Sequence, residues 1–246
     1  MDIDKIEGYV FDDTTHKALF KLSSNNIIDA IDYPISSGKE AITFLGHLKD
    51  NLLVAKIFKN ENTTKFKNME DYINGDRRFE RRTREKRIID IWASKEYKNL
   101  SLAHKNLVSC PIPITVQNNV LIMSFLGEEK NAFPLLKEVK DFDFEKVYVQ
   151  IIDNYGKLLY AANLVHADFS AYNILINPTT DEIYIIDFGQ AVITSHPKAS
   201  DFLKRDIINI TDFLNKFDKT KKLSYESILE DIKKRKDIYG RNIKDK

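Results

Sequence analysis

The chain has 246 residues, of which 43% are hydrophobic, so it can bury a sizeable core as one two-lobed domain or as two small ones. Its formal net charge of +1 gives no overall attraction to a membrane surface or to DNA, and neither is expected as a partner. A single cysteine excludes an internal disulfide, and neither a signal peptide nor a membrane-length apolar run is visible, so we expect a soluble, cytoplasmic protein.

Two strands joined by a turn are predicted near the start of the chain, at residues 41–46 and 52–58. Residues 35–40, just before them, predict a loop of small residues. The backbone amides of this loop could approach a phosphate. The loop has one glycine and lacks the G-x-G-x-x-G pattern, so by itself it does not specify a phosphate site.

Two basic blocks stand out in an otherwise balanced chain, at residues 77–87 and 233–236. Two interpretations of the first block stay open: a solvated helix face or loop, or a surface that contacts RNA or phosphate. For the second block a solvated surface is favoured. Cys110, in an apolar segment, is expected to be a small buried hydrophobic residue.

One long helix is predicted over about residues 83–105. Its inward positions recur at helical spacing and are Ile88, Ile91, Trp92, Lys95, Glu96, Asn99, Leu100 and Ala103. A glutamate on an inward face is costly unless a cation pairs with it. Lys56, in the strand at 52–58, is the natural partner of Glu96. The alternative is an ordinary exposed glutamate and an unremarkable strand lysine.

Residues 120–127 form an apolar run that ends at a glycine and predicts a further strand. It is either a plain core strand ended by a turn, or a strand whose last residues line a ligand site. Those residues would be Met123, Ser124 and Leu126.

The second half of the chain is predicted to be mostly helical. The helix at 144–164 would face inward with Val147, Ile151, Tyr155, Leu158 and Ala162. A second helix is predicted at 199–217, and Ser224 is expected to cap a short last helix that runs through Ile232. Strands first and helices later predict an α+β fold.

Two carboxylates and an amide stand at the ends of a predicted hairpin. Asp168 and Asn173 are separated by four residues, and Asp187 directly follows the apolar run 183–186. Residues 173–176 predict the partner strand, because turn residues separate the two runs. The hairpin would bring Asn173 and Asp187 side by side at one end, where they could share a magnesium ion.

This spacing is the one used in phosphoryl transfer. Protein kinases use an Asp that orients and deprotonates the acceptor hydroxyl, an Asn after four intervening residues and the Asp of a D-F-G triplet for metal. Asp168 would be that base, and Asn173 and Asp187 would hold metal. Lys56 and Glu96 would correspond to the phosphate-binding lysine and its helical partner. Taken singly, Asp168 also fits a turn residue, and Asp187 a strand-end cap.

Seven segments spread over the whole chain are similar to one known family: residues 36–41, 55–59, 75–79, 92–100, 165–173, 186–192 and 196–197. They resemble the RIO family of atypical serine/threonine protein kinases, in particular its type-one subfamily. Too few residues precede Ser36 for the winged helix of the second subfamily, so the short, archaeal-like form is expected. The resemblance implies a two-lobed protein-kinase-like fold, with a small β-rich lobe at 1–125 and a reduced helical lobe at 126–246.

The resemblance also implies roles for site residues. In the first lobe, ATP would be cradled by Ser37, Gly38 and Lys39, its phosphates would meet Lys56 held by Glu96, and its adenine would meet Met123 and the backbone of Ser124 and Leu126. In the second lobe, Asp168 would be the catalytic base, and Asn173 and Asp187 would bind Mg²⁺, with Mn²⁺ as an alternative. Asp187 would also accept a phosphoryl group as a phospho-aspartate.

By the same resemblance, the chain would be a kinase and ATPase that autophosphorylates and acts in maturation of the small ribosomal subunit. Its partner would be the precursor of that subunit, through protein and also through rRNA. Two departures are visible: Ser124 replaces a glutamate of the hinge, and Ala171 replaces an acidic residue of the catalytic loop. Only 57 residues follow Gly189 (246 − 189) and no Ala-Pro-Glu is present, so a peptide-docking platform is not expected.

Two other functions stay open. Small-molecule phosphotransferases of the aminoglycoside or choline kinase type share the pattern around Asp168 and Asp187, although they usually have more chain after it. A nucleotide-gated RNA- or pre-ribosome-binding protein with negligible chemistry would account for the basic block at 77–87.

Overall fold

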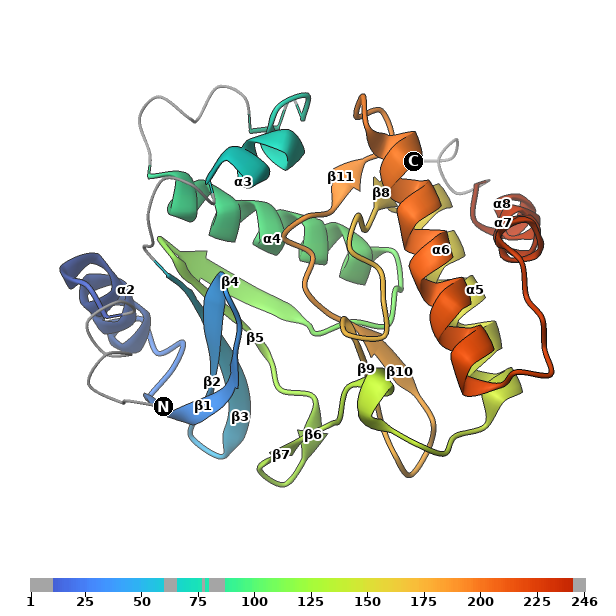
Figure 1. The fold of residues 1–246 in the computed structure, drawn as a ribbon. Helices are drawn as coiled ribbons and strands as arrows, with labels where there is room; N and C mark the ends of the chain where they lie inside the picture. The colour runs from blue at the N-terminus through green and yellow to red at the C-terminus, as the bar shows by residue number, and fades with distance from the viewer. Residues whose placement is uncertain (1–10, 60–65, 77, 80–86, 241–246) are drawn as a thin grey trace. The chain divides into compact units, whose positions relative to one another are not determined.

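The computed structural model describes residues 11–59, 66–76, 78–79 and 87–240 (Figure 1). The chain divides into two compact units. The first consists of Met1–Lys98 and Ile112–Ala132, and the second of Asn99–Pro111 and Phe133–Lys246. The division into lobes at residues 125 and 126 stays a prediction.

The first unit is built on a five-stranded antiparallel sheet with the order β1-β2-β3-β5-β4. Its strands are β1 (Ala30–Ser37), β2 (Ala41–Leu48), β3 (Asn51–Phe58), β4 (Pro113–Gln117) and β5 (Val120–Ser124). The predicted strands at 41–46 and 52–58 are confirmed as β2 and β3, which pair from Ala41 with Phe58 to Leu48 with Asn51. A short hairpin of β6 (Gly127–Glu128) and β7 (Asn131–Ala132) follows.

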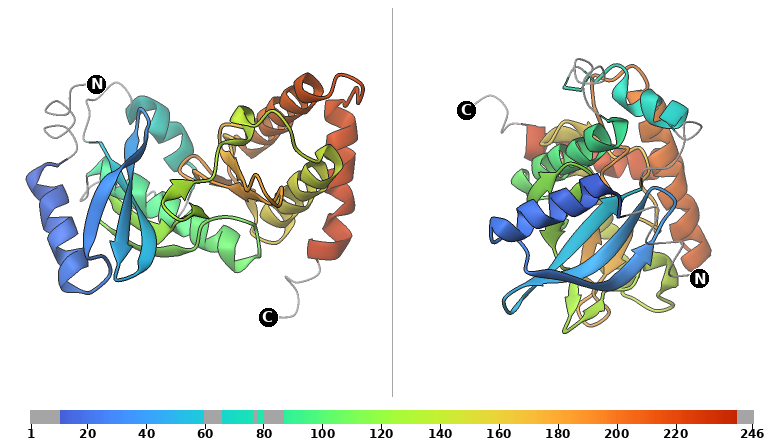
Figure 2. Two further views of the ribbon diagram at one scale, coloured as in Figure 1. Left: turned by 90° about the horizontal axis from the view of Figure 1, so that it is seen from below. Right: turned by 90° about the vertical axis from the view of Figure 1, so that its left-hand side faces the viewer.

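Helices cover both faces of this sheet, as Figures 1 and 2 show. Helix α2 (Asp13–Ser24) packs Ala18 and Leu22 against one face, and α4 (Ile88–Lys105), with α3 (Phe66–Ile73), packs against the other. Because side chains alternate along a strand, Val120 and Ile122 of β5 face α2, whereas Leu121 packs with the α4 side. The last turns of α4 belong to the second unit.

Two sequence predictions for this unit need correction, and two of its elements were not predicted. Residues 35–37 were expected in a loop, but they complete β1, which is mostly exposed and therefore shows no apolar alternation. The predicted helix at 83–105 begins only at Ile88; residues 83–86 lie outside the described residues, and Arg87 precedes the helix. Helix α2 and strand β4 were not predicted.

The second unit is mainly helical and contains two short antiparallel strand pairs. Its elements are the 3-10 turn η2 (Leu136–Glu138), α5 (Phe144–Tyr160), β8 (Leu164–Val165), β9 (Ile174–Ile176), β10 (Ile183–Ile185), β11 (Val192–Ile193), α6 (Ala199–Phe217), α7 (Tyr225–Lys234) and α8 (Lys236–Tyr239). β9 pairs with β10, and β8 pairs with β11. The α+β fold predicted from the sequence is confirmed.

Several local predictions for this unit are also confirmed. Helix α6 spans the predicted residues, and Ser224 caps α7 by accepting a hydrogen bond from the Ser227 amide, with a distance of 3.1 Å from N to Oγ. The five inward residues of the 144–164 helix are all buried. The helix itself ends earlier, at Tyr160, because Asn163 adopts a left-handed conformation (φ 54°) that turns the chain into β8.

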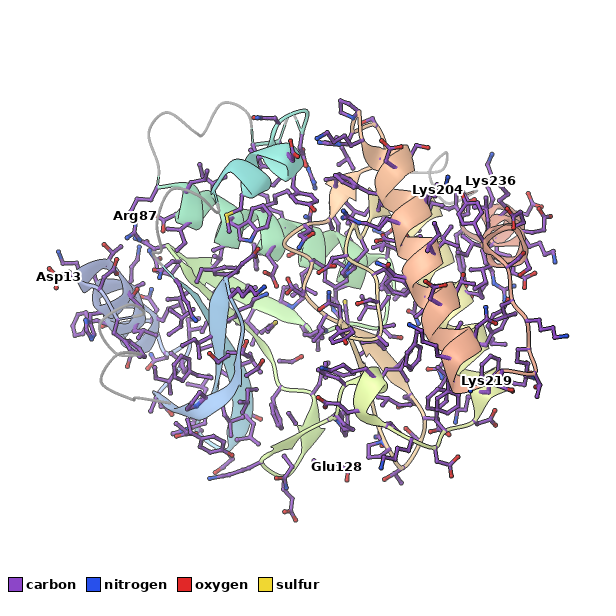
Figure 3. All side chains as sticks on the ribbon, viewed as in Figure 1. Asp13, Arg87, Glu128, Lys204, Lys219 and Lys236 are labelled. Atoms are coloured by element: carbon purple, nitrogen blue, oxygen red, sulfur yellow. The ribbon has the colours of Figure 1, made fainter. Side chains whose placement is uncertain are left out.

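The remaining composition-level predictions have mixed outcomes. Cys110 is buried, which raises the pKa of its thiol to about 12 and leaves it unreactive, as expected for a hydrophobic packing residue. Lys233, Lys234 and Lys236 of the second basic block are exposed; Figure 3 labels Lys236. Of the first block, residues 77 and 80–86 lie outside the described residues, so its role stays a prediction. No described helix is long and apolar enough to cross a membrane.

Candidate active site

The hairpin of β9 and β10 places Asn173 and Asp187 together at one end. Ile174 is paired with Ile185, and the Ile186 amide donates to the Asn173 carbonyl with a distance of 3.0 Å from N to O. Asn173 therefore lies opposite Ile186, and Asp187 is the next residue beyond it, so the hairpin brings both to the same end, as the sequence predicted. Asp187 adopts a left-handed conformation with φ 63°, which a non-glycine residue rarely takes.

Asn173 also binds the backbone and the side chain of Asp168. Its Nδ2 lies 2.8 Å from the Asp168 carbonyl oxygen and 2.9 Å from the Asp168 Oδ2. Both partners are oxygen acceptors, so the amide must present its NH₂ group to them. Its carbonyl Oδ1 therefore points the other way. An amide oxygen of this kind, beside a carboxylate, suits a hard cation such as Mg²⁺.

The environment of Asp168 favours proton uptake. Burial raises the pKa of Asp168, and the negative charge of Asp187 raises it further, although the hydrogen bond from Asn173 and the charge of Arg205 act against the shift. A carboxylate with a raised pKa is a better proton acceptor. The electrostatic effect of Asp187 on Asp168 also indicates that the two carboxylates belong to one site.

Asp206 of α6 holds the loop that carries Asp168, and sequence reasoning missed it. Its Oδ2 accepts hydrogen bonds from the Ala167 amide, at 2.8 Å, and from the Tyr155 hydroxyl, at 2.7 Å. Its Oδ1 accepts from the Phe169 amide at 2.9 Å. The two amides flank Asp168, so one buried carboxylate fixes the backbone on both sides of it. Burial raises the pKa of Asp206 to about 6, although these donors favour its charged form.

The hydrogen bonds to Asp206 stabilise a strained backbone conformation at Ala167. Ala167 has φ 65°, a left-handed conformation that costs a non-glycine residue on the order of 1–3 kcal/mol. The Arg205 guanidinium also donates to the Ala167 carbonyl, so both backbone polar groups of this residue are held. Strain that is held from several sides is a common property of functional loops.

Asn99 of α4 holds the loop that carries Asp187, and no role was predicted for it beyond an inward position. Its Nδ2 lies 3.0 Å from the Phe188 carbonyl oxygen and 2.7 Å from the Ala191 carbonyl oxygen. Phe188 is buried and its ring lies 5.0 Å from the ring of His166, centroid to centroid. The residues on either side of the loop are therefore fixed by hydrogen bonds and by packing.

In the first unit, Lys56 and Glu96 form the predicted ion pair. The Lys56 Nζ lies 2.8 Å from each carboxylate oxygen of Glu96, and both side chains are buried. β3 supplies the lysine and α4 the glutamate. Such a pair keeps a buried ammonium charged and in a fixed position, as a phosphate-binding lysine requires.

Ser37 is the last residue of β1, and Gly38 and Lys39 lie in the connection to β2. The Gly38 amide donates to the Ala41 carbonyl at 2.9 Å, and the Lys59 ammonium donates to the Gly38 carbonyl at 2.9 Å. Ser37, Gly38 and Lys39 are all exposed. A Cβ at Gly38 would lie 3.5 Å from the Ala41 carbonyl oxygen, an ordinary contact, so the fold itself does not require glycine here.

The three predicted adenine-side residues lie at the end of β5 and just beyond it. Met123 pairs with Val54 of β3, and Leu126 lies between β5 and β6. The Ser124 amide donates to the Ile112 carbonyl at 2.9 Å, and the Ser124 hydroxyl accepts from the Ile112 amide at 2.8 Å. The serine that replaces the hinge glutamate thus has a structural role, and a backbone contact at this residue would use its carbonyl group.

The predicted site residues thus fall into two groups. The first unit holds Ser37, Gly38, Lys39, Lys56, Glu96, Met123, Ser124 and Leu126, and the second holds Asp168, Asn173 and Asp187. Among the described residues, no cluster of three or more His, Cys, Asp or Glu side chains could hold a metal. A metal bound at Asn173 and Asp187 would therefore need further oxygen ligands, and Mg²⁺ typically takes these from water and substrate phosphates.

Comparison with known proteins decides the family. A family model described as the RIO domain matches residues 43–228. The chain belongs to the RIO family. Two archaeal relatives, each named RIO-type serine/threonine-protein kinase Rio1, come from Haloferax volcanii and Methanocaldococcus jannaschii. They are 39% and 37% identical to it over 213 residues, which cover 86% of this chain and 72% of each relative. This RIO protein is therefore a protein kinase of the Rio1 type.

The fold of this RIO kinase is similar to that of a solved structure, the Rio2 kinase–ADP/Mg²⁺–phosphoaspartate complex from Chaetomium thermophilum. The TM-score is 0.63 at 20% identity, over 93% of this chain and 75% of that one. A second structure of the same kinase gives a TM-score of 0.61 at 21% identity, over 92% of this chain and 76% of that one. The kinase-like α+β fold predicted from the sequence is confirmed.

Proposed function

We propose that this RIO kinase uses ATP and Mg²⁺ to transfer a phosphoryl group to serine or threonine hydroxyls, and that it also hydrolyses ATP. The observation that carries the proposal is the arrangement of Asp168, Asn173 and Asp187. One amide orients a carboxylate with a raised pKa and keeps its own carbonyl oxygen for a cation beside a second carboxylate. The names of the archaeal relatives support serine and threonine as acceptors.

Each residue would have a separate part in the reaction. Asp168 would accept the proton of the attacking hydroxyl while the hydroxyl oxygen bonds to the γ-phosphorus. The bond from that phosphorus to the β,γ-bridging oxygen breaks, and ADP leaves with its electrons. Asn173, through Oδ1, and Asp187 would hold Mg²⁺ (or Mn²⁺), which when bound neutralises charge on the phosphate oxygens. Lys56, oriented by Glu96, would contact the α- and β-phosphates.

The loop at Ser37, Gly38 and Lys39 would bind phosphate through its backbone. The described residues leave room for a Cβ at Gly38, and close approach of a ligand is a physical reason for glycine at that position. Met123, Leu126 and the Ser124 carbonyl would contact the adenine.

Asp187 would also form an aspartyl phosphate. Support comes from the Rio2 kinase structure, which is described as an ADP/Mg²⁺-phosphoaspartate complex. An acyl phosphate is cleaved by hydroxylamine, whereas phosphoserine is stable to it. Labelled ATP should therefore leave hydroxylamine-labile phosphate on the parent chain and none on Asp187→Asn; label that resists hydroxylamine would exclude this role.

The cellular process would be maturation of the small ribosomal subunit, as the resemblance to the type-one RIO kinases implies. The partner would be the precursor particle, contacted through protein and through rRNA. Steady-state ATP turnover, measured with and without purified precursor particles, tests both the proposed chemistry and the proposed partner. Turnover that requires Asp168 supports the chemistry, and stimulation by the particle supports the partner. Equal turnover by the parent and by Asp168→Asn would exclude the chemistry.

A further inference from the structure

Gln190 brings a second amide to the carboxylate of Asp168. It follows the Asp187-Phe188-Gly189 triplet, and its Nε2 lies 3.5 Å from the Asp168 Oδ2. The Asn173 Nδ2 lies 2.9 Å from the same oxygen. Two amides, from two different loops, thus converge on Oδ2.

The backbone that presents Gln190 is fixed on both sides. The Asn99 side chain bonds the carbonyl of Phe188, two residues before Gln190, and the carbonyl of Ala191, one residue after it. The Ala191 amide also donates to the Phe188 carbonyl at 3.2 Å, which closes the turn. The chain then enters β11, where Val192 pairs with Val165 of β8. The position of Gln190 beside Asp168 is therefore built into the fold.

The direct contact between Gln190 and Asp168 can be exchanged for contacts with a water molecule. At 3.5 Å it is at the long limit for a hydrogen bond, so a water molecule can replace it at little cost. A half-buried glutamine carries both a donor and an acceptor at the end of a flexible side chain. Its Oε1 can accept a hydrogen bond from a water whose other proton is directed at Asp168.

This geometry distinguishes water from a protein hydroxyl. Water has two protons, so it needs one acceptor to remove a proton and a second to fix its orientation. A serine or threonine hydroxyl has one proton, and its orientation is set by its own chain. The acceptor at Gln190 therefore has a partner only when the nucleophile is water.

We propose that Gln190 is a catalytic residue for ATP hydrolysis, and that it holds the attacking water together with Asp168. The inference rests on the proposed function. In the step, ADP has already left with the formation of the aspartyl phosphate, and the water oxygen bonds to the phosphorus carried by Asp187. The bond from that phosphorus to the Asp187 oxygen breaks, its electron pair returns to the Asp187 carboxylate, and one water proton passes to Asp168 and then to solvent. Phosphoryl transfer to a protein hydroxyl uses Asp168 without Gln190.

The test measures both reactions in one tube. Release of labelled inorganic phosphate reports hydrolysis, and acid-stable, hydroxylamine-resistant label on serine or threonine reports transfer to a hydroxyl. Gln190→Met keeps nearly the same volume and removes the amide; Gln190→Ala serves as a second variant. We expect both to lower phosphate release at least about tenfold, while hydroxyl transfer changes by less than about twofold, because only water loses its second contact.

Binding and folding are measured separately from turnover. Affinity for a fluorescent ADP analogue and the melting temperature should match those of the parent for both variants. Gln117→Met, a glutamine of β4 in the first unit, is the matched control and should leave both reactions unchanged.

The outcomes separate this inference from the proposed function. If the parent releases phosphate no faster than Asp168→Asn, the proposed function itself fails. If the parent turns over ATP and the Gln190 variants lower hydrolysis and transfer equally, or leave hydrolysis unchanged, the role of Gln190 is overturned while the proposed function stands. A parent that transfers phosphate to hydroxyls without hydrolysing ATP also overturns it.

Discussion

Lys56 shares its ammonium group equally between the two carboxylate oxygens of Glu96, at 2.8 Å from each, in a buried environment. Removing either charge alone leaves the other buried without its main partner. Lys56→Met should therefore lower the free energy of unfolding by roughly 3–5 kcal/mol, as measured by urea denaturation. The double variant Lys56→Met/Glu96→Leu should recover most of this loss, because two apolar side chains replace the pair.

ATP turnover, measured on the same variants, distinguishes a loss of activity from a loss of stability. The double variant should remain inactive even though it is stable, because the phosphate contact is gone. Lys21→Met, an exposed lysine of α2, is the control and should change neither property. A double variant that is as unstable as the sum of the two single variants would contradict the pair as the source of the effect.

Asp206 predicts a pH dependence of stability. Its pKa is about 6 in the folded protein and 3.8 ordinarily, so between these values the folded state binds the proton more tightly. The stability contributed by this group is therefore fully present below about pH 4 and is lost as the pH rises to about 6, by up to about 3 kcal/mol. Asp206→Asn removes the titration.

The measurement is the difference in unfolding free energy between the parent and Asp206→Asn across this pH range. That difference should shrink as the pH rises, by an amount that the control Asp201→Asn, an exposed aspartate of the same helix, does not show. Asp206→Asn should also lower kcat at every pH, because an amide has one acceptor oxygen and cannot accept the hydrogen bonds now made to both Oδ1 and Oδ2. A constant difference with pH would show that Asp206 does not titrate in this range.

Gly38→Ala should affect nucleotide binding and leave folding intact. Among the described residues, the added Cβ meets only the Ala41 carbonyl oxygen, at 3.5 Å, so the melting temperature should not change. If backbone amides of this loop approach the phosphates, the methyl group should lower ATP affinity by about tenfold, or about 1.4 kcal/mol, as measured by calorimetry. Unchanged affinity would place the phosphates elsewhere.

Two substitutions of Asn99 are expected to lower the free energy of unfolding by different amounts. Asn99→Ala removes the two donors to the Phe188 and Ala191 carbonyls and should cost about 1–3 kcal/mol in unfolding free energy. Asn99→Asp places a carboxylate against the same two carbonyl oxygens and should cost more. Chemical denaturation of both variants checks the order, and an aspartate variant as stable as the parent would show that the amide does not hold this loop.

The strongest sequence prediction concerned a hairpin whose two strands are close together in the chain. The hairpin that joins Asn173 to Asp187 could be derived because residues 183–186 form a continuous apolar run, and because turn residues precede them. The Lys56–Glu96 pair followed from a physical cost: a glutamate on an inward helix face needs a cation, and the nearest predicted strand offers one.

The missed features depend on tertiary contacts or on weak patterns. Asp206 lies on a helix whose period predicts an apolar core face, and nothing local shows that a carboxylate there bonds amides 37 and 39 residues away. Strand β1 is largely exposed, so the period-2 signal is absent. Helix α2 buries three residues, Thr15, Ala18 and Leu22, too few for a clear apolar stripe.

The central claim is that Asn173 and Asp187 hold a divalent cation beside Asp168, and anomalous diffraction from crystals grown with Mn²⁺ and a non-hydrolysable ATP analogue tests it most directly. The account predicts one anomalous peak at about 2.0–2.3 Å from the Asn173 Oδ1 and from a carboxylate oxygen of Asp187, with phosphate oxygens completing its coordination. Bound nucleotide with the manganese peak away from both residues, or with the Asn173 amide nitrogen turned toward the metal, would contradict it.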